Sequence, residues 1–276
     1  MAAKPAKSYA GDVVTIQQTP PPPSTLMAAA NAAAEIYATD EFEKHAQFLA
    51  DAWTAKVKKQ TGLYVQSAQT IAQAIARGEK LESAGPVTLT TPAYPWWNIL
   101  LAGPFQPTAP TAGGPYLPHK IFRATEPAFM LGGVWMNPAP INWAPAGPSA
   151  ADMMGALNLQ INFETINLST VTNVPGPGPV TMAPIGLAGG PPFFKPFVVS
   201  IGSGFFPAPP SGAPNLYELI CTADVTGPVP GLPFAGYSTW VLDPDFEPPI
   251  FPPSLMPGVP PTWQYDIPAR FMVYTA

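Results

Sequence analysis

The densest group of side chains able to do chemistry is an acidic segment near the end of the chain. Asp243, Asp245 and Glu247 alternate with other residues, and alternate residues of an extended backbone point to the same side. Converging carboxylates bind hard cations such as Ca²⁺, and a carboxylate pair also serves in glycoside hydrolysis. We favour a solvated acidic loop, with calcium binding and a hydrolase site as the weaker alternatives.

Other catalytic groups are sparse. Cys221 is the only cysteine, and it lies in an apolar run that is typical of a small buried hydrophobic residue. The only histidines are His45 and His119, which are too few and too far apart to predict a zinc site. The sequence contains no Gly-x-Ser-x-Gly elbow and no P-loop. We therefore expect no enzymatic activity and no cofactor.

Charge is distributed very unevenly. Residues 1–82 contain 16 of the 29 Lys, Arg, Asp and Glu residues, whereas residues 83–276 contain 13 of them together with 36 of the 41 prolines. Soluble proteins use about 25% charged residues, and this chain uses 11%. In a free monomer, a surface with so little charge gives poor protection against aggregation. We expect it to be covered by copies of the chain or by other subunits.

The overall balance of charge and hydropathy limits the other partners. A net charge of −5 argues against nucleic acid, whose binding needs a basic surface. The longest apolar runs fall well short of the ~20 residues of a membrane helix, and the N-terminus lacks the apolar core of a signal peptide. The sequence thus predicts a soluble protein of unknown location, with no membrane span, that forms part of a particle or filament.

The first third of the chain is predicted to contain an arm and a helical unit. Residues 1–23 form the arm, in which a β-compatible run precedes the rigid spacer Pro20 to Pro23. Residues 24–82 form the helical unit, with breaks expected at Asp40 and Gly62 and an end at Gly78. Its main helix carries one apolar stripe: Phe42, Ala46, Leu49, Trp53 and Val57. The spacing of breaks predicts a helical hairpin or a three-helix unit.

Residues 83–276 are predicted to form a proline-rich antiparallel β-sandwich, which makes the fold class α+β. The clearest strand is 157–164, where apolar residues alternate with three amides and Glu164. Further strands are expected at 87–91, 98–101, 120–124, 129–135, 197–201, 217–225, 238–242 and 270–275. Long loops are expected at 102–118, 138–150, 175–194, 202–215 and 243–262. Their prolines and aromatic residues indicate loops that are ordered by packing.

These observations favour a non-enzymatic structural subunit of a self-assembling virion, filament or appendage. Its partners would be copies of itself or other assembly subunits. The residues expected to make assembly contacts are apolar residues of the arm and of the β domain: Val13, Val14, Ile16, Trp96, Trp97, Phe193, Phe194, Phe205, Phe206 and Phe251. The first alternative is a carbohydrate-binding or adhesive module, because the tryptophans of this region offer planar surfaces to a glycan. The second alternative is a hydrolase that uses the acidic cluster.

Overall fold

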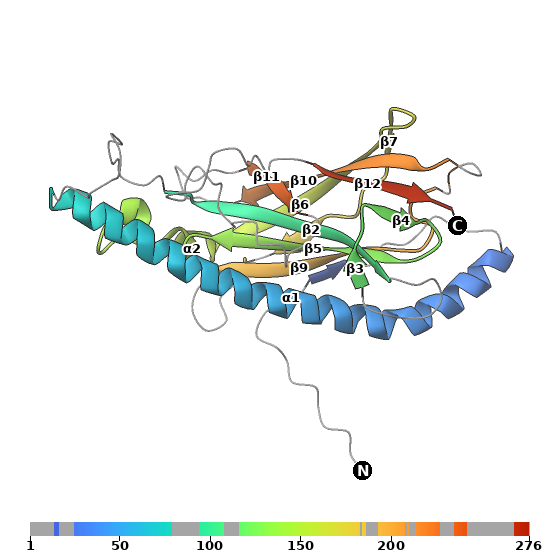
Figure 1. Cartoon of the computed structure of the whole chain (residues 1–276), viewed down its shortest axis with the longest axis horizontal. Coiled ribbons are helices and arrows are strands. Elements are labelled where there is room, and N and C mark those ends of the chain that lie inside the picture. The colour runs from blue at the N-terminus through green and yellow to red at the C-terminus, as the bar shows by residue number, and fades with distance from the viewer. Residues whose placement is uncertain are drawn as a thin grey trace, which may run out of the picture.

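The computed structural model describes residues 14–16, 25–78, 94–107, 116–182, 184–185, 193–207, 209, 213–226, 235–241 and 268–275. Within these ranges one long helix, α1 (Thr25–Ala76), lies along a body built from many strands (Figure 1). The strands form two sheets in which most pairings are antiparallel. The α+β class is therefore confirmed. The predicted boundaries at 23/24 and 82/83 lie outside the described residues.

The first sheet, here called sheet A, lies next to α1. Its neighbours run in the order β1 (Val14–Ile16), β9 (Phe194–Ile201), β5 (Ala128–Met136) and β2 (Trp97–Pro107). The far edge of β2 pairs with β3 (Tyr116–Pro118) and with the end of β11 (Ala235–Val241). The β1–β9 and β2–β11 pairings are parallel, which departs from the predicted antiparallel arrangement.

The second sheet, here called sheet B, is centred on β10 (Asn215–Thr226). One edge of β10 pairs with β6 (Asn158–Asn167), and the other pairs with β12 (Ala269–Tyr274) and with the start of β11. β6 also pairs with β7 (Thr172–Val174) and β8 (Val180–Met182), and β12 pairs in parallel with β4 (Ile121–Arg123). Because β11 pairs with both β10 and β2, it joins the two sheets.

The main hydrophobic core contains residues from both sheets. β6 shows how the sequence produces it: Leu159 and Ile161 are fully buried there, while Asn158 and Gln160 on the same strand are exposed. The predicted alternation over 157–164 is therefore confirmed. On the facing sheet the same core receives side chains from β2, β5 and β9: Ile99, Leu101, Met130, Val134, Phe197 and Val199.

A second core lies between α1 and the other face of sheet A. From the helix it takes Ala46, Ala50, Trp53, Val57, Tyr64 and Ala68, and from the sheet Leu100, Phe129, Leu131, Trp135, Phe194 and Val198. The predicted stripe is thus buried wherever its side chains are described, with Leu49 only partly so. The indole N–H of Trp135 donates a hydrogen bond of 3.0 Å to the buried Thr61 hydroxyl on the helix. Sheet A is consequently covered on both faces, which explains why every residue of β5 is buried.

The predicted helical hairpin or three-helix unit is wrong, because α1 is continuous from Thr25 to Ala76. Neither Asp40 nor Gly62 interrupts it. A glycine inside a helix costs only about 1 kcal/mol relative to alanine, and the packing of Trp53, Val57 and Tyr64 on sheet A offsets that cost. Gly78, with φ of +69°, adopts the left-handed conformation that ends helices, as predicted.

The strand predictions for the body are confirmed for β2, β4, β5, β6, β9, β10, β11 and β12, with boundaries that differ by up to three residues. The exception is the end of β2, which was predicted at residue 101 and lies at Pro107. The prediction at 87–91 lies outside the described residues. Three predicted loops contain regular structure. The last six residues of β2 and all of β3 lie in 102–118, the 3-10 helix η1 (Ile141–Trp143) and the start of α2 (Ala150–Met154) lie in 138–150, and β8 lies in 175–194. The elements β3, η1, α2 and β8 are three to five residues long, too short to produce a recognisable period.

Candidate functional site

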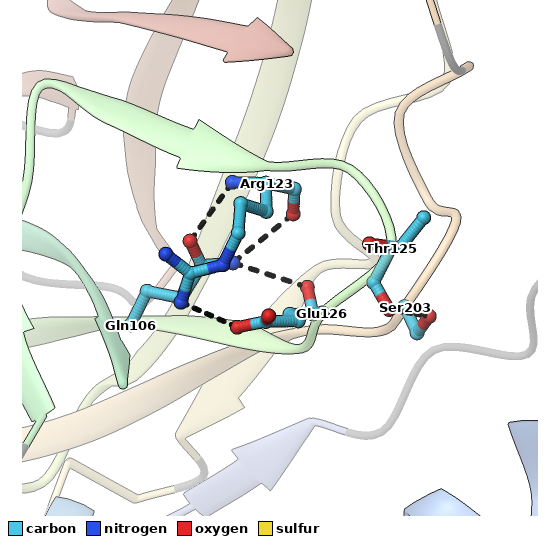
Figure 2. A network of polar contacts seen from close by, with 5 residues as sticks. All are labelled: Gln106, Arg123, Thr125, Glu126 and Ser203. Atoms are coloured by element: carbon cyan, nitrogen blue, oxygen red, sulfur yellow. Dashed lines mark hydrogen bonds and ion pairs between the residues drawn. The ribbon is translucent and has the colours of Figure 1, made fainter. Parts of the chain in front are cut away.

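A network of polar contacts surrounds the turn between β4 and β5 (Figure 2). Gln106 of β2 is 1% exposed, and its side-chain amide reaches across to this turn. Its Nε2 donates to the carbonyls of Arg123 (3.0 Å) and Glu126 (3.3 Å), while its Oε1 accepts from the Arg123 N–H (2.8 Å). The Ser203 hydroxyl donates to the Thr125 carbonyl at 2.6 Å. Gln106 and Ser203 thereby add side-chain hydrogen bonds to a turn that already has a backbone hydrogen bond from the Glu126 N–H to the Arg123 carbonyl (3.3 Å).

The same turn holds an ion pair between Arg123 and Glu126. Their side chains are only 11% and 18% exposed, and the hydrogen bond to Glu126 is the largest cause of a raised Arg123 pKa. The guanidinium is thus held charged beside its carboxylate. The Ser203 hydroxyl donates to a backbone carbonyl rather than to a base. The network orders the turn and presents no activated nucleophile.

His119 adds a pH dependence to this region. The pKa of its imidazole lies below the usual 6.5, first because burial disfavours the charged form and then because Arg123 is nearby. The unfolded chain therefore binds a proton more readily than the folded chain, so stability falls as pH drops below 6.5. We expect the urea midpoint to decrease between about pH 7.5 and about pH 5.5. His119→Gln should reduce this decrease, and an identical pH profile in the variant would contradict the assignment.

The outer face of sheet B carries a second group of polar side chains. On β6 and β10, Gln160 donates to Asn162 (2.9 Å), and Asn162 donates to Asp224 (3.2 Å). Further along the sheet, Arg270 pairs with Glu218 at 2.7 Å. Gln160, Asp224 and Arg270 are exposed, Asn162 is half-buried, and the Glu218 side chain is only 13% exposed. These side chains bond to one another on the face of sheet B that points away from the main core.

The outer side of α1 carries exposed apolar residues, which the sequence analysis did not identify. Phe48 is 68% exposed and Leu63 is 62% exposed. Both lie off the stripe that packs on sheet A, and Ala52, Ala55 and Gly62 are exposed along the same helix. The signal in the sequence was that Phe48 and Leu63 do not fit the spacing of the buried stripe.

The residues predicted to make assembly contacts fall into three groups. Val14 and Ile16 lie in β1, whereas Val13 and Phe251 lie outside the described residues. Phe194 and Phe206 are buried in the chain's own cores. The remaining four are only partly buried and pack at the margins of those cores: Trp96, Trp97, Phe193 and Phe205. Among the predicted aromatic contacts that the structure describes, these four retain exposed surface for a partner.

The structure tests the prediction for Cys221 but not the one for the acidic segment. Asp243, Asp245 and Glu247 lie outside the described residues. Within the described ranges no cluster of three His, Cys, Asp or Glu side chains is arranged to hold a metal ion. Cys221 is buried, and burial raises its thiol pKa to about 12. It is therefore a core residue, as predicted, because a nucleophilic cysteine requires an accessible thiolate.

Two of the tryptophans considered for glycan contact are core residues. Trp135 is fully buried and Trp143 is 6% exposed, so neither offers a ring face to a sugar. Trp240 has no described side-chain environment, and Trp263 lies outside the described residues. Trp96 and Trp97 remain partly accessible.

The polar network could have been anticipated from the spacing of charges. No Lys, Arg, Asp or Glu lies between Glu82 and Lys120 or between Glu126 and Asp152. Charges isolated in so apolar a region are expected to be paired when they are buried, which is the arrangement of Arg123 and Glu126. No such signal indicated the role of Gln106, because nothing in the sequence links an uncharged amide in one strand to a particular turn elsewhere in the chain.

Comparison with known proteins adds no functional assignment. No protein-family model matches the sequence, and no curated protein is significantly similar to it. No helix in the described part of the chain is long and apolar enough to cross a membrane.

Proposed function

We propose that this chain is a non-enzymatic structural subunit of a larger assembly, such as a virion, a filament or an appendage. The observation that carries the proposal is the scarcity of charge over residues 83–276, which contain only 13 charged residues. Surfaces exposed to solvent need interspersed charges to remain dispersed. A surface that lacks them is suited to contact with other subunits.

The placement of those charges strengthens the argument. Lys195 is 7% exposed, and Arg123 and Glu126 are both largely withdrawn from solvent at the β4–β5 turn. The body surface therefore carries even less charge than the composition implies. The outer face of sheet B is mostly polar but uses amides together with a few charges, including one ion pair. Amides at an interface can bond to a partner without the desolvation cost of ions.

The arrangement of the sheets fits this role. We interpret sheets A and B as a β-sandwich, because residues of both sheets share one core. The helix covers one outer face of the sandwich, and the polar face of sheet B is the other. A rigid body with two different outer faces can make two different kinds of subunit contact.

The proposal predicts that the chain isolated from its source is oligomeric or bound to partners. Its native mass should be a multiple of 29.1 kDa or should include other chains. Native mass measurement followed by imaging of any particle tests this directly. A chain that stays a soluble 29.1 kDa monomer at high concentration would overturn the proposal. Glycan binding by such a monomer, lost on Trp97→Ala, would favour the carbohydrate-binding alternative instead.

A second prediction concerns the N-terminal arm. β1 pairs in parallel with β9, with Thr15 opposite Val198. An arm that adds a strand to a sheet edge is able to do the same on a neighbouring subunit, and the four prolines that follow lower the entropy lost on docking. Deleting residues 1–19 should leave the remainder folded, judged by its circular dichroism and melting curve, and weaken assembly. Assembly equal to that of the full chain would show that the arm has no such role.

A further inference from the structure

The outer side of α1 has the features of a surface that pairs with a copy of itself. It combines two exposed large apolar residues with small residues and with charges of both signs. We call this surface the outer stripe of α1 and define it by six exposed residues: Phe48, Asp51, Ala55, Lys58, Gly62 and Leu63. The exposed Ala52 and Lys59 lie on the same side of the helix. Scattered surface apolar residues need no explanation. These residues, however, share one side of one helix.

The helical positions of these residues place them on one face. With about 100° of rotation per residue, the six lie within an arc of about 140° centred close to Ala55. A line drawn through Ala55 parallel to the helix axis divides this face into two sides. Phe48 and Leu63 lie on one side, and Asp51 and Lys58 lie on the other. The opposite side of the helix is occupied by Trp53 and Val57, which pack on sheet A.

The spacing along the helix axis is self-complementary. Phe48 lies about 10.5 Å before Ala55, and Leu63 lies about 12 Å after it, at ~1.5 Å per residue. Asp51 lies about 6 Å before Ala55, and Lys58 lies about 4.5 Å after it. A second helix laid antiparallel, with a two-fold axis at Ala55, therefore brings Phe48 against the partner's Leu63. It also brings Asp51 against the partner's Lys58.

We propose that a second copy of this chain docks its α1 antiparallel on the outer stripe, with the two-fold axis at Ala55. This names the partner for one contact of the proposed assembly, and in that respect it rests on the proposed function. The contact is isologous, so each apolar pair and each ion pair occurs twice. Ala55 and Gly62 permit a close approach of the helices, because the space around a Cβ at Gly62 is empty to 4 Å.

The test uses a single cysteine on the two-fold axis of the full chain. Ala55→Cys places two thiols opposite each other in the proposed dimer, and the native Cys221 is buried and does not interfere. Gln73→Cys is the matched control, since it is exposed on the same side of the helix but far from the axis. Mild oxidation should give about tenfold more disulfide dimer from Ala55→Cys, because the contact raises the effective thiol concentration. Equal yields from the two variants would overturn the proposal.

Charge reversal provides an independent test. Asp51→Lys and Lys58→Asp each place like charges opposite each other, and each should reduce cross-linking in the Ala55→Cys background. The double reversal restores opposite charges and should restore the yield. A merely local effect on the helix would not be rescued in this way. Failure of the double variant to recover, while both single variants remain folded, would contradict the pairing.

The outcome is separable from that of the proposed function. If the chain assembles by light scattering but Ala55→Cys does not cross-link preferentially, the helix contact is wrong and the structural role is retained. If the chain remains monomeric and does not cross-link, both are wrong. Cross-linking of Ala55→Cys to a different protein from the native source would show that another chain covers the stripe, and would also overturn the proposed self-contact.

Discussion

Replacing Trp53 with alanine is expected to lower the free energy of unfolding by about 3–5 kcal/mol. Trp53 is 6% exposed in the core between α1 and sheet A, and its ring meets Phe194 edge-to-face with centroids 5.4 Å apart. The substitution removes the largest buried side chain that the helix places on the sheet. The cavity cannot close fully because β5 and β9 are held by sheet B on their other face. Urea unfolding of both proteins measures the difference.

The control for this prediction is an aromatic residue on the same helix. Phe48 is 68% exposed, so Phe48→Ala should change the stability by less than about 0.5 kcal/mol at concentrations too low for association. Alanine has a higher helix propensity than either aromatic residue. Comparing the two variants therefore isolates the loss of packing at Trp53. An unfolding curve for Trp53→Ala that matches the wild type would mean that α1 does not depend on sheet A for its stability.

How far the fold could be predicted depends on how many faces of an element are covered. β6 has one buried face and one wet face, so its alternating side chains predicted the strand and its orientation correctly. β5 is buried on both faces and shows no alternation. Its strand character was visible from its β-branched and aromatic residues. The helix that covers its second face could not be assigned to it from local sequence.

The helix shows where local signals mislead. Asp40 and Gly62 match the residue types that begin and end helices, yet α1 passes through both. Local preferences near 1 kcal/mol are outweighed when neighbouring turns of the helix pack on strands that are distant in sequence, as Trp53 packs on Phe194. That long-range packing is not encoded in any short segment, so the number of helices could not be derived from spacing alone.

The candidate surfaces were predictable only in part. The scarcity of charge pointed to covered surfaces without locating them. The exposed position of Phe48 and Leu63 on α1 emerged only once sheet A defined which side of the helix is buried. Similarly, Phe194 and Phe206 looked like candidates for a partner until the structure showed them in the cores. An aromatic residue in a loop or a strand has the same sequence signature in either environment.

The second large effect concerns a glycine that allows two strands to pack closely. Gly132 of β5 lies opposite Phe197 of β9, and the Phe197 ring covers its backbone. A Cβ at Gly132 would overlap that ring. Because Phe197 is fully buried in the main core, the ring has no free space into which it can move. Glycine within a strand often marks such a close approach.

We therefore expect Gly132→Ala to destabilise the fold by about 3 kcal/mol, at the upper end of the range for overpacked cores. Gly62→Ala on α1 is the matched control. A Cβ there meets nothing within 4 Å, so the change should stabilise the helix by about 0.5–1 kcal/mol.

Combining Gly132→Ala with Phe197→Leu tests the cause, because the shorter leucine side chain relieves the overlap. The double variant should lose less stability than the sum of the two single changes. Denaturant unfolding of the four variants measures these terms. Strict additivity of the two core changes would show that the ring of Phe197 is not what excludes a side chain at Gly132.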